Sequence, residues 1–157
     1  MVLLYRVSDA DAQAKRHPGQ GIVTIEDMQV EVRPFLDWRK CTPREYRKYA
    51  ELLYEHMDWQ SDAMSPFISA TRDYNWARGE ARRRVEQGNQ DVVIYHIETK
   101  ISSGNVQFRP ILSLLERLGI EEDELNYGAQ ALLDHECLFL HQIPEESIVR
   151  TEHFRSL

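Results

Sequence analysis

Several features that define other classes of protein are scarce in this sequence. It has two cysteines, Cys41 and Cys137, which is too few for a disulfide scaffold, and we expect both to be free thiols. No stretch approaches the roughly 20 apolar residues of a membrane span, and residues 1–6 are too short for a secretory leader. We therefore expect no membrane partner, and a protein that is cytoplasmic or secreted without a visible signal peptide.

An excess of positive charge is also missing. The 157 residues include 26 acidic and 19 basic side chains, which gives a formal net charge of −7 at pH 7. Binding to a phosphate backbone requires a positive surface, so nucleic acid is not an expected partner. The basic triplet at residues 82–84 alternates with Glu80 and Glu86, a pattern that is typical of a solvated helix face.

The composition fits one compact domain. Apolar residues make up 42% of the chain, which is enough for a single hydrophobic core at this length. No internal repeat, low-complexity tract or linker divides the sequence. We expect a monomer with a single domain over residues 1–157.

Helices and strands are both predicted, in an order typical of an α+β domain. Thr42, Pro43 and Glu45 form a helix start that predicts a helix from about 43 to 57. Asp73 is expected to cap a second helix that turns Trp76 inward, and Gly119 is expected to stop a third. The remaining expectations are strands at 2–5, 65–71, 91–97, from Glu136 and at 147–151, an exposed loop at 8–21, weak alternation at 22–34, a third helix over 111–118 and a weaker helix at 125–133.

The carboxylates at the head of the last long apolar run are the strongest functional signal. Asp134 and Glu136 precede the run 137–140, and Ile143-Pro144 follows it. Residues two apart on a strand point to the same face, so the pair places negative charge beside a buried element. A solvated strand end accounts for many such pairs, and the pair alone does not assign a function.

Four fragments in order carry a family resemblance. The chain resembles the arginine, serine-threonine-serine, glutamate class of ADP-ribosyltransferases, the cholera-toxin-like group to which pierisin-type toxins also belong. The resemblance runs from Arg6 to about Arg150 and rests on Tyr5-Arg6, Phe67-Ile68-Ser69-Ala70-Thr71, the apolar strand at 92–97, and Asp134-x-Glu136 with Ile143-Pro144 behind it.

The resemblance implies a fold, a substrate and a site. The fold would be an ADP-ribosyltransferase-like split β-sandwich of two small sheets flanked by helices, with NAD bound in a cleft between the sheets. Glu136 would stabilise the cationic ribose as nicotinamide leaves, and Arg6 would anchor the diphosphate or the adenosine ribose. Ser69 would hold the rotamer of Glu136, with Thr71 in the same supporting role.

Asp134 bears on the acceptor of the ADP-ribose. In the family, a carboxylate at this position accompanies transfer to arginine side chains of a protein, but aspartate is one methylene, about 1.5 Å, shorter than glutamate. Hydrolysis of NAD by water therefore stays open as an alternative. So does a noncatalytic interaction module that uses the acidic face at 121–124. Ala70 also departs from the family, which usually has threonine there. No metal site is expected at His135 or His141.

Overall fold

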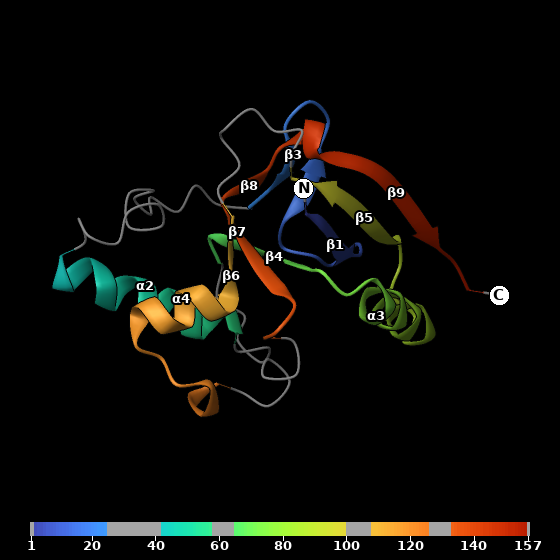
Figure 1. The fold of residues 1–157 in the computed structure, drawn as a ribbon. Helices are drawn as coiled ribbons and strands as arrows, with labels where there is room; N and C mark the ends of the chain where they lie inside the picture. Colours follow the sequence, from blue (N-terminus) through green and yellow to red (C-terminus); the bar gives the residue numbers. More distant parts are fainter. Residues whose placement is uncertain (1, 25–41, 58–64, 100–107, 126–132, 157) are drawn as a thin grey trace.

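The computed structural model describes residues 2–24, 42–57, 65–99, 108–125 and 133–156, and its strands form two antiparallel sheets (Figure 1). One sheet has six strands in the order β6-β7-β4-β1-β5-β9, and the other has three in the order β2-β3-β8. The strands are β1 Leu3–Ser8, β2 Lys15–His17, β3 Gly21–Val23, β4 Phe67–Thr71, β5 Val92–Glu98, β6 Phe108–Pro110, β7 Glu136–Leu140, β8 Gln142–Ile143 and β9 Ile148–Phe154. The α-helices in the described ranges are α2 Pro43–Met57, α3 Tyr74–Glu86 and α4 Ile111–Leu118, and two short 3-10 helices are η2 Glu122–Glu124 and η3 Glu145–Ser147.

The helix ends follow the predicted local signals. At the start of α2, the Glu45 amide donates to Thr42 Oγ1 and the Thr42 hydroxyl donates back to the Glu45 carboxylate, both at 3.2 Å. Asp73 caps α3 by accepting a hydrogen bond from the Trp76 amide at 3.1 Å. Helix α4 ends at Gly119, which adopts a left-handed conformation with φ of 67°. The helices predicted at 43–57, after Asp73 and at 111–118 are confirmed.

The strand predictions are confirmed for the long strands and incomplete for the short ones. Strand β5 lies between β1 and β9, as its apolar character predicts for a strand away from the edge. The predicted loop at 8–21 instead contains β2 and leads into β3, and β6 was not predicted. The alternation at 25–34, most of the predicted helix at 125–133 and Cys41 lie outside the described residues.

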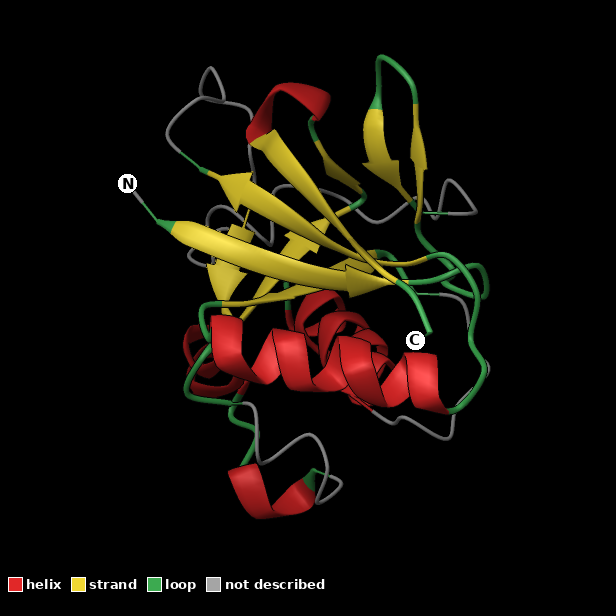
Figure 2. Cartoon of the chain, turned by 90° about the vertical axis from the view of Figure 1, so that its right-hand side faces the viewer, coloured by secondary structure: helices red, strands yellow, loops and turns green. Residues whose placement is uncertain are grey.

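Three apolar clusters cover the faces of the large sheet. Helices α2 and α4 pack on β4 and β7 through residues such as Leu53, Leu114 and Leu138. Helix α3 packs on β1 and β5, with Ala77 and Ala81 fully buried. The third cluster includes Ile68 and Ile143 and joins the large sheet to the small one. Figure 2 shows the three long helices on one side of the strands.

The six-stranded sheet has a seam between β1 and β4. Strand β1 pairs with β5 along its whole length, from Leu3 to Ser8, but it pairs with β4 through Tyr5 and Thr71. Beyond that pair the two strands diverge, which leaves room for side chains between them. This seam positions the cleft that is described below.

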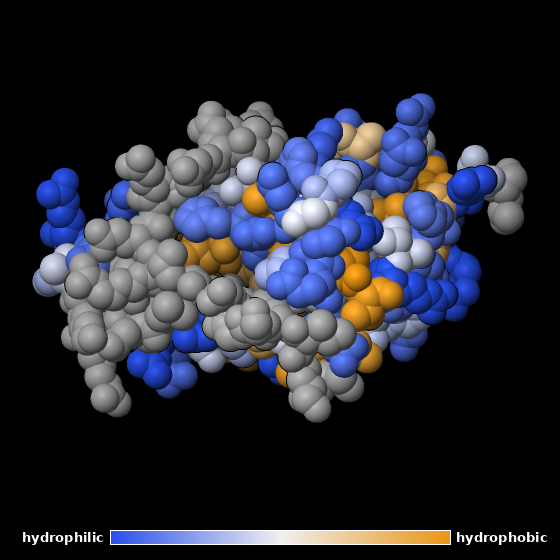
Figure 3. All heavy atoms as spheres, turned by 90° about the horizontal axis from the view of Figure 1, so that it is seen from above, coloured by the Kyte–Doolittle hydropathy of each residue, from blue (hydrophilic) through white to orange (hydrophobic). Residues whose placement is uncertain are grey.

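The observed architecture is an α+β domain with two antiparallel sheets and flanking helices, which confirms the predicted fold class. Polar side chains cover most of the described surface in Figure 3. Among the described residues, the large apolar side chains that are exposed are Leu3 and Val149, at 43% and 46%. No helix in the described ranges is long and apolar enough to cross a membrane.

Candidate active site

A cleft of about 480 Å³ opens over the seam between β1 and β4. The resemblance implied a cleft between the two sheets. The strand residues that line the observed cleft all come from the six-stranded sheet, so the cleft lies elsewhere. Helices α2 and α3 supply the rest of the lining. The lining residues are Tyr5, Arg6 and Val7 of β1, His56 of α2, Ser69, Ala70 and Thr71 of β4, Trp76, Glu80, Arg83 and Arg84 of α3, and Glu136 of β7.

Four predicted site residues meet in this cleft. Arg6, Ser69, Thr71 and Glu136 are separated by up to 130 positions in the sequence, yet all of them line it. The strand order β7-β4-β1 explains the convergence, because it sets the strands of Glu136, Ser69 and Arg6 next to one another. Their chemical roles stay predictions.

Arg6 is a buried cation without a carboxylate partner among the described residues. Its Nη1 donates to the backbone carbonyl of Ser69 at 2.9 Å, and its Nε is buried with no hydrogen-bond partner in the described parts of the chain. Burial, followed by repulsion from Arg84, lowers the pKa of Arg6 to about 10. An anion bound in the cleft would offset both the burial of the Arg6 charge and its repulsion from Arg84.

Glu136 begins β7 and is 8% exposed. Burial raises the pKa of its carboxyl to about 7, although a hydrogen bond from Ser69 opposes the rise. Its Oε2 is buried without a partner among the described residues. The carboxyl can therefore switch its charge near neutral pH, and it keeps one oxygen for a ligand group.

His56 links Ser69 to α2 and was not predicted as a site residue. Its Nε2 lies 2.6 Å from Ser69 Oγ, and its Nδ1 lies 2.7 Å from Ser65 Oγ. Burial, together with the charge of Arg6, lowers the pKa of His56 to about 4, so the ring is neutral at pH 7.

The charge of Glu136 decides the direction of this network, and the following direction holds for the ionised form. An ionised Glu136 can only accept, so the single hydroxyl hydrogen of Ser69 is given to Glu136. Nε2 of His56 must then donate to Ser69, and Nδ1 must accept from Ser65. The Ser65 oxygen is itself held by the Phe67 amide at 3.1 Å. The result is a chain of hydrogen bonds that fixes the Ser69 hydroxyl toward the catalytic candidate.

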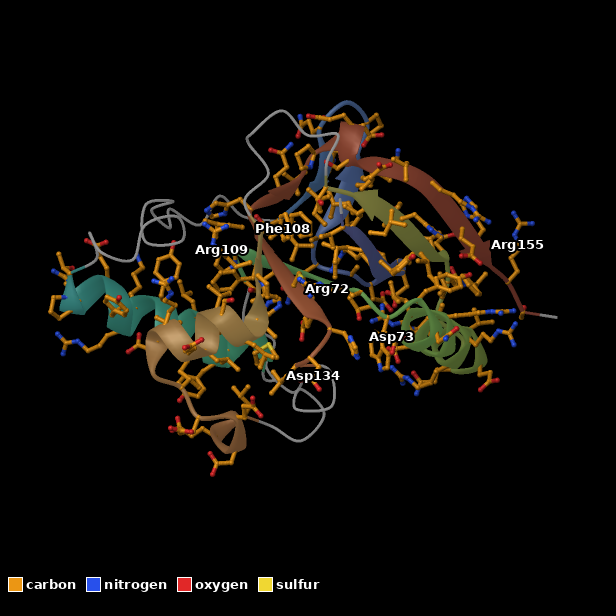
Figure 4. The ribbon with its side chains drawn as sticks, in the orientation of Figure 1. Arg72, Asp73, Phe108, Arg109, Asp134 and Arg155 are labelled. Atoms are coloured by element: carbon orange, nitrogen blue, oxygen red, sulfur yellow. The ribbon has the colours of Figure 1, made fainter. Side chains whose placement is uncertain are left out.

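Thr71 and Asp134 differ in their distance from this network. Thr71 is 5% exposed and opposes Glu136 in the β4–β7 register, and its Oγ1 accepts the Asp73 amide at 3.1 Å. Asp134 is exposed and lies in the turn that leads into β7 (Figure 4). It does not line the cleft. Asp134 and Glu136 were predicted to point to the same face, as residues two apart on a strand do. Strand β7 begins only at Glu136, so the backbone at Asp134 is not extended in the sheet and the prediction does not apply.

Helix α3 contributes cleft residues that the sequence pattern assigned elsewhere. Trp76 packs against the apolar cluster under α3, as predicted, but it is only half-buried and its other side lines the cleft. Arg83 is 53% exposed, as predicted for a solvated face, and Arg84 is less exposed, and both line the cleft as well. Arg84 is 25% exposed and pairs with Asp9 at 2.9 Å, a long-range contact that helical spacing does not reveal. His56 carried one weak signal, since it precedes the buried Met57 in an amphipathic pattern.

The chain matches a protein family and is similar to a solved structure. The family model described as "Domain of unknown function (DUF7587)" matches residues 2–157. No curated protein matches the chain. A solved structure named "EcPltA" is similar with a TM-score of 0.49 and 18% identity, over 95% of this chain and 73% of that one. A similarity at this level does not assign an activity.

Proposed function

We propose a function for this chain, which belongs to the DUF7587 family of domains of unknown function, on the basis of its cleft. The chain is an NAD-dependent mono-ADP-ribosyltransferase, a glycosyltransferase that cleaves the nicotinamide–ribose bond and passes ADP-ribose to a protein acceptor. The observation that supports it best is the meeting of Arg6, Ser69 and Glu136 in one cleft. Each of them belongs to one of the four fragments that carry the sequence resemblance.

The chemistry of the cleft suits this reaction. Loss of nicotinamide leaves positive charge on the ribose, and an ionised Glu136 beside it would stabilise that charge. The unpartnered Oε2 of Glu136 can accept a ribose hydroxyl, while the network through Ser69 and His56 holds the carboxylate in place. Arg6 has an unpartnered Nε and no carboxylate bound to it among the described residues, and it would bind the diphosphate.

Hydrolysis of NAD is the second candidate, and the position of Asp134 favours it. A residue that orients an arginine nucleophile should face the reacting ribose, but Asp134 is exposed in the turn before β7 and does not line the cleft. Water could then serve as the acceptor with the same Arg6, Ser69 and Glu136. Transfer to arginine and the role of Asp134 in it stay proposals.

Incubation with NAD labelled in the adenylate part, in the presence of a cell lysate, tests both candidates. Label on protein indicates transfer, free labelled ADP-ribose indicates hydrolysis, and unchanged NAD contradicts both. Glu136→Gln should lower kcat by about 100-fold or more, because it removes the charge that stabilises the transition state. Glu146→Gln removes an exposed carboxylate outside the cleft and should leave the rate unchanged.

Asp134→Ala separates transfer from hydrolysis. If Asp134 orients the acceptor, this variant will lose the label on protein while it still cleaves NAD. Equal labelling by the variant and the wild type would remove Asp134 from the mechanism. Full activity of Glu136→Gln would overturn the proposed function.

A further inference from the structure

One face of α3 lines the cleft and carries three kinds of side chain. Four residues of α3 line the cleft: Trp76, and Glu80, Arg83 and Arg84, which follow it by four, seven and eight positions. Ala77 and Ala81 are buried against the sheet. We call the first four residues the α3 stripe. Arg82, on the same helix, is exposed and outside the cleft.

Arg84 is fixed in position by two carboxylates. Its Nε donates to Glu80 and its Nη1 donates to Asp9, both at 2.9 Å. Asp9 is held in turn by the Asn89 side chain at 3.1 Å and by the Asp11 amide at 2.8 Å. A guanidinium has five N–H donors, and these two contacts use two of them. Arg84 can therefore bind a ligand without first losing side-chain freedom.

Arg6 and Arg84 form a positive end of the cleft. Burial and the charge of Arg84 lower the pKa of Arg6, while the charges of Tyr95 and Asp9 oppose the fall. Glu80 and Asp9 are bound to Arg84 and not to Arg6. Two guanidinium groups that share one cleft suit a ligand with adjacent negative charges, and a diphosphate has this chemistry.

Trp76 forms an aromatic end of the same stripe. It lies in the first turn of α3, which follows β4 through Asp73, and Thr71 at the end of β4 opposes Glu136. The eight positions from Trp76 to Arg84 correspond to about 12 Å along the helix axis. The aromatic end is thus the one connected to the Glu136 strand, and the cationic end is the one held by Asp9.

We propose that the α3 stripe sets the direction of the bound dinucleotide: Trp76 stacks on the nicotinamide ring, and Arg84 together with Arg6 binds the diphosphate. This inference rests on the proposed function and deepens it. In NAD one ribose joins the nicotinamide to the diphosphate, so this direction leaves the bond that breaks on the Glu136 side of the cleft. The reverse direction would put adenine on Trp76 and would separate Glu136 from the reacting ribose.

Binding of four probes to three variants tests the direction. The probes are NAD, nicotinamide, ADP-ribose and inorganic pyrophosphate, measured by calorimetry with the full chain. Trp76→Ala should weaken NAD and nicotinamide by about 10-fold and leave ADP-ribose and pyrophosphate unchanged. Arg84→Gln should weaken NAD, ADP-ribose and pyrophosphate by about 10-fold or more and leave nicotinamide unchanged. Arg82→Gln is the matched control on the outer face of α3 and should change none of them.

Conservative variants guard against a loss of folding. Trp76→Phe should recover most of the binding of nicotinamide, because a phenyl ring also stacks. Arg84→Lys keeps the charge but not the planar donor pair, and it should bind pyrophosphate more weakly than the wild type does. Wild-type binding of pyrophosphate by Arg84→Lys and Arg84→Gln would overturn the role of Arg84. Weakened ADP-ribose binding with unchanged nicotinamide binding in Trp76→Ala would overturn the direction.

The two proposals fail in different ways. If the probes bind with the expected selectivity but neither the wild type nor any variant cleaves NAD, the proposed role of the α3 stripe in binding is supported and the proposed function is wrong. If the wild type, Trp76→Ala and Arg84→Gln cleave NAD with the same kcat/KM, the proposed function is supported and the proposed role of the α3 stripe is wrong. A wild-type chain that binds none of the four probes contradicts both.

Discussion

The pair Glu136 and His56 should oppose each other in the pH dependence of folding. Glu136 has a pKa of about 7 in the folded chain and an ordinary value of 4.5, so the folded state holds an extra proton between these values. Its contribution to the free energy of unfolding therefore falls as pH rises from 4.5 to 7. His56 has a pKa of about 4 in the folded chain against an ordinary 6.5, so the unfolded state holds the extra proton. Its contribution rises with pH from 4 to 6.5.

The magnitudes are nearly equal, so the two effects largely cancel in the wild type. Each pKa is displaced by about 2.5 pH units, and about 1.4 kcal/mol per unit gives about 3 kcal/mol for each group. Both groups lie in the same network through Ser69. Removing either one should expose the pH dependence of the other.

Urea unfolding from pH 4 to 8, followed by circular dichroism, measures this. The free energy of unfolding of Glu136→Gln, minus that of the wild type, should rise by about 3 kcal/mol between pH 4.5 and 7. The same difference for His56→Gln should fall by about 3 kcal/mol between pH 4 and 6.5. Glu146→Gln, an exposed control, should give a flat difference. Flat curves for the first two variants, or curves with the same sign, would refute the burial that we assign to this network.

Four further predictions follow from individual residues. The kcat/KM for NAD cleavage should rise with pH through about 7, as Glu136 ionises, and a flat profile would contradict its role as the stabilising charge. Gly21→Ala should destabilise the fold by more than 3 kcal/mol in thermal unfolding, since φ is +96° and a Cβ there would lie 2.0 Å from the Ile143 carbonyl oxygen. Gly79→Ala, in α3 with no neighbouring atom within 4 Å of its Cβ position, should instead stabilise by about 1 kcal/mol, and destabilisation would show that the helix face is occupied. Asp73→Ala should cost about 1 kcal/mol through loss of the α3 cap, with Asp123→Ala as an exposed control, and an unchanged melting temperature would argue against the cap.

The elements that could be predicted are those whose signals are local. The capping pair of Thr42 and Glu45 is complete within four residues, so the start of α2 is visible in the sequence. Strand β2 is polar throughout, and it forms because β3 pairs with it and β8 covers the other edge of β3. Strand β3 follows β2 in the same hairpin, but β8, which completes the small sheet, comes from residues 142–143, and a window of sequence around β2 does not contain it.

The candidate site divides in the same way. Arg6, Ser69 and Glu136 were predicted because a family pattern supplied their order, and the antiparallel order β7-β4-β1 brings them together. His56 and Arg84 acquire their positions from contacts with Ser69 and Asp9, which lie 13 and 75 positions away. Neither has a pattern of its own that separates it from an ordinary residue of an amphipathic helix.

The seam between β1 and β4 has a mechanical consequence. The apolar cluster that includes Ile68 and Ile143 packs the small sheet against strands on either side of the seam. Strands β1 and β4 themselves pair at Tyr5 and Thr71. The least protected backbone amides of the large sheet should therefore be those along this line. A dinucleotide that touched Arg6 on one side and Glu136 on the other would act as a staple across the seam. Slower hydrogen exchange at β1 and β4 on addition of NAD would record that closure directly.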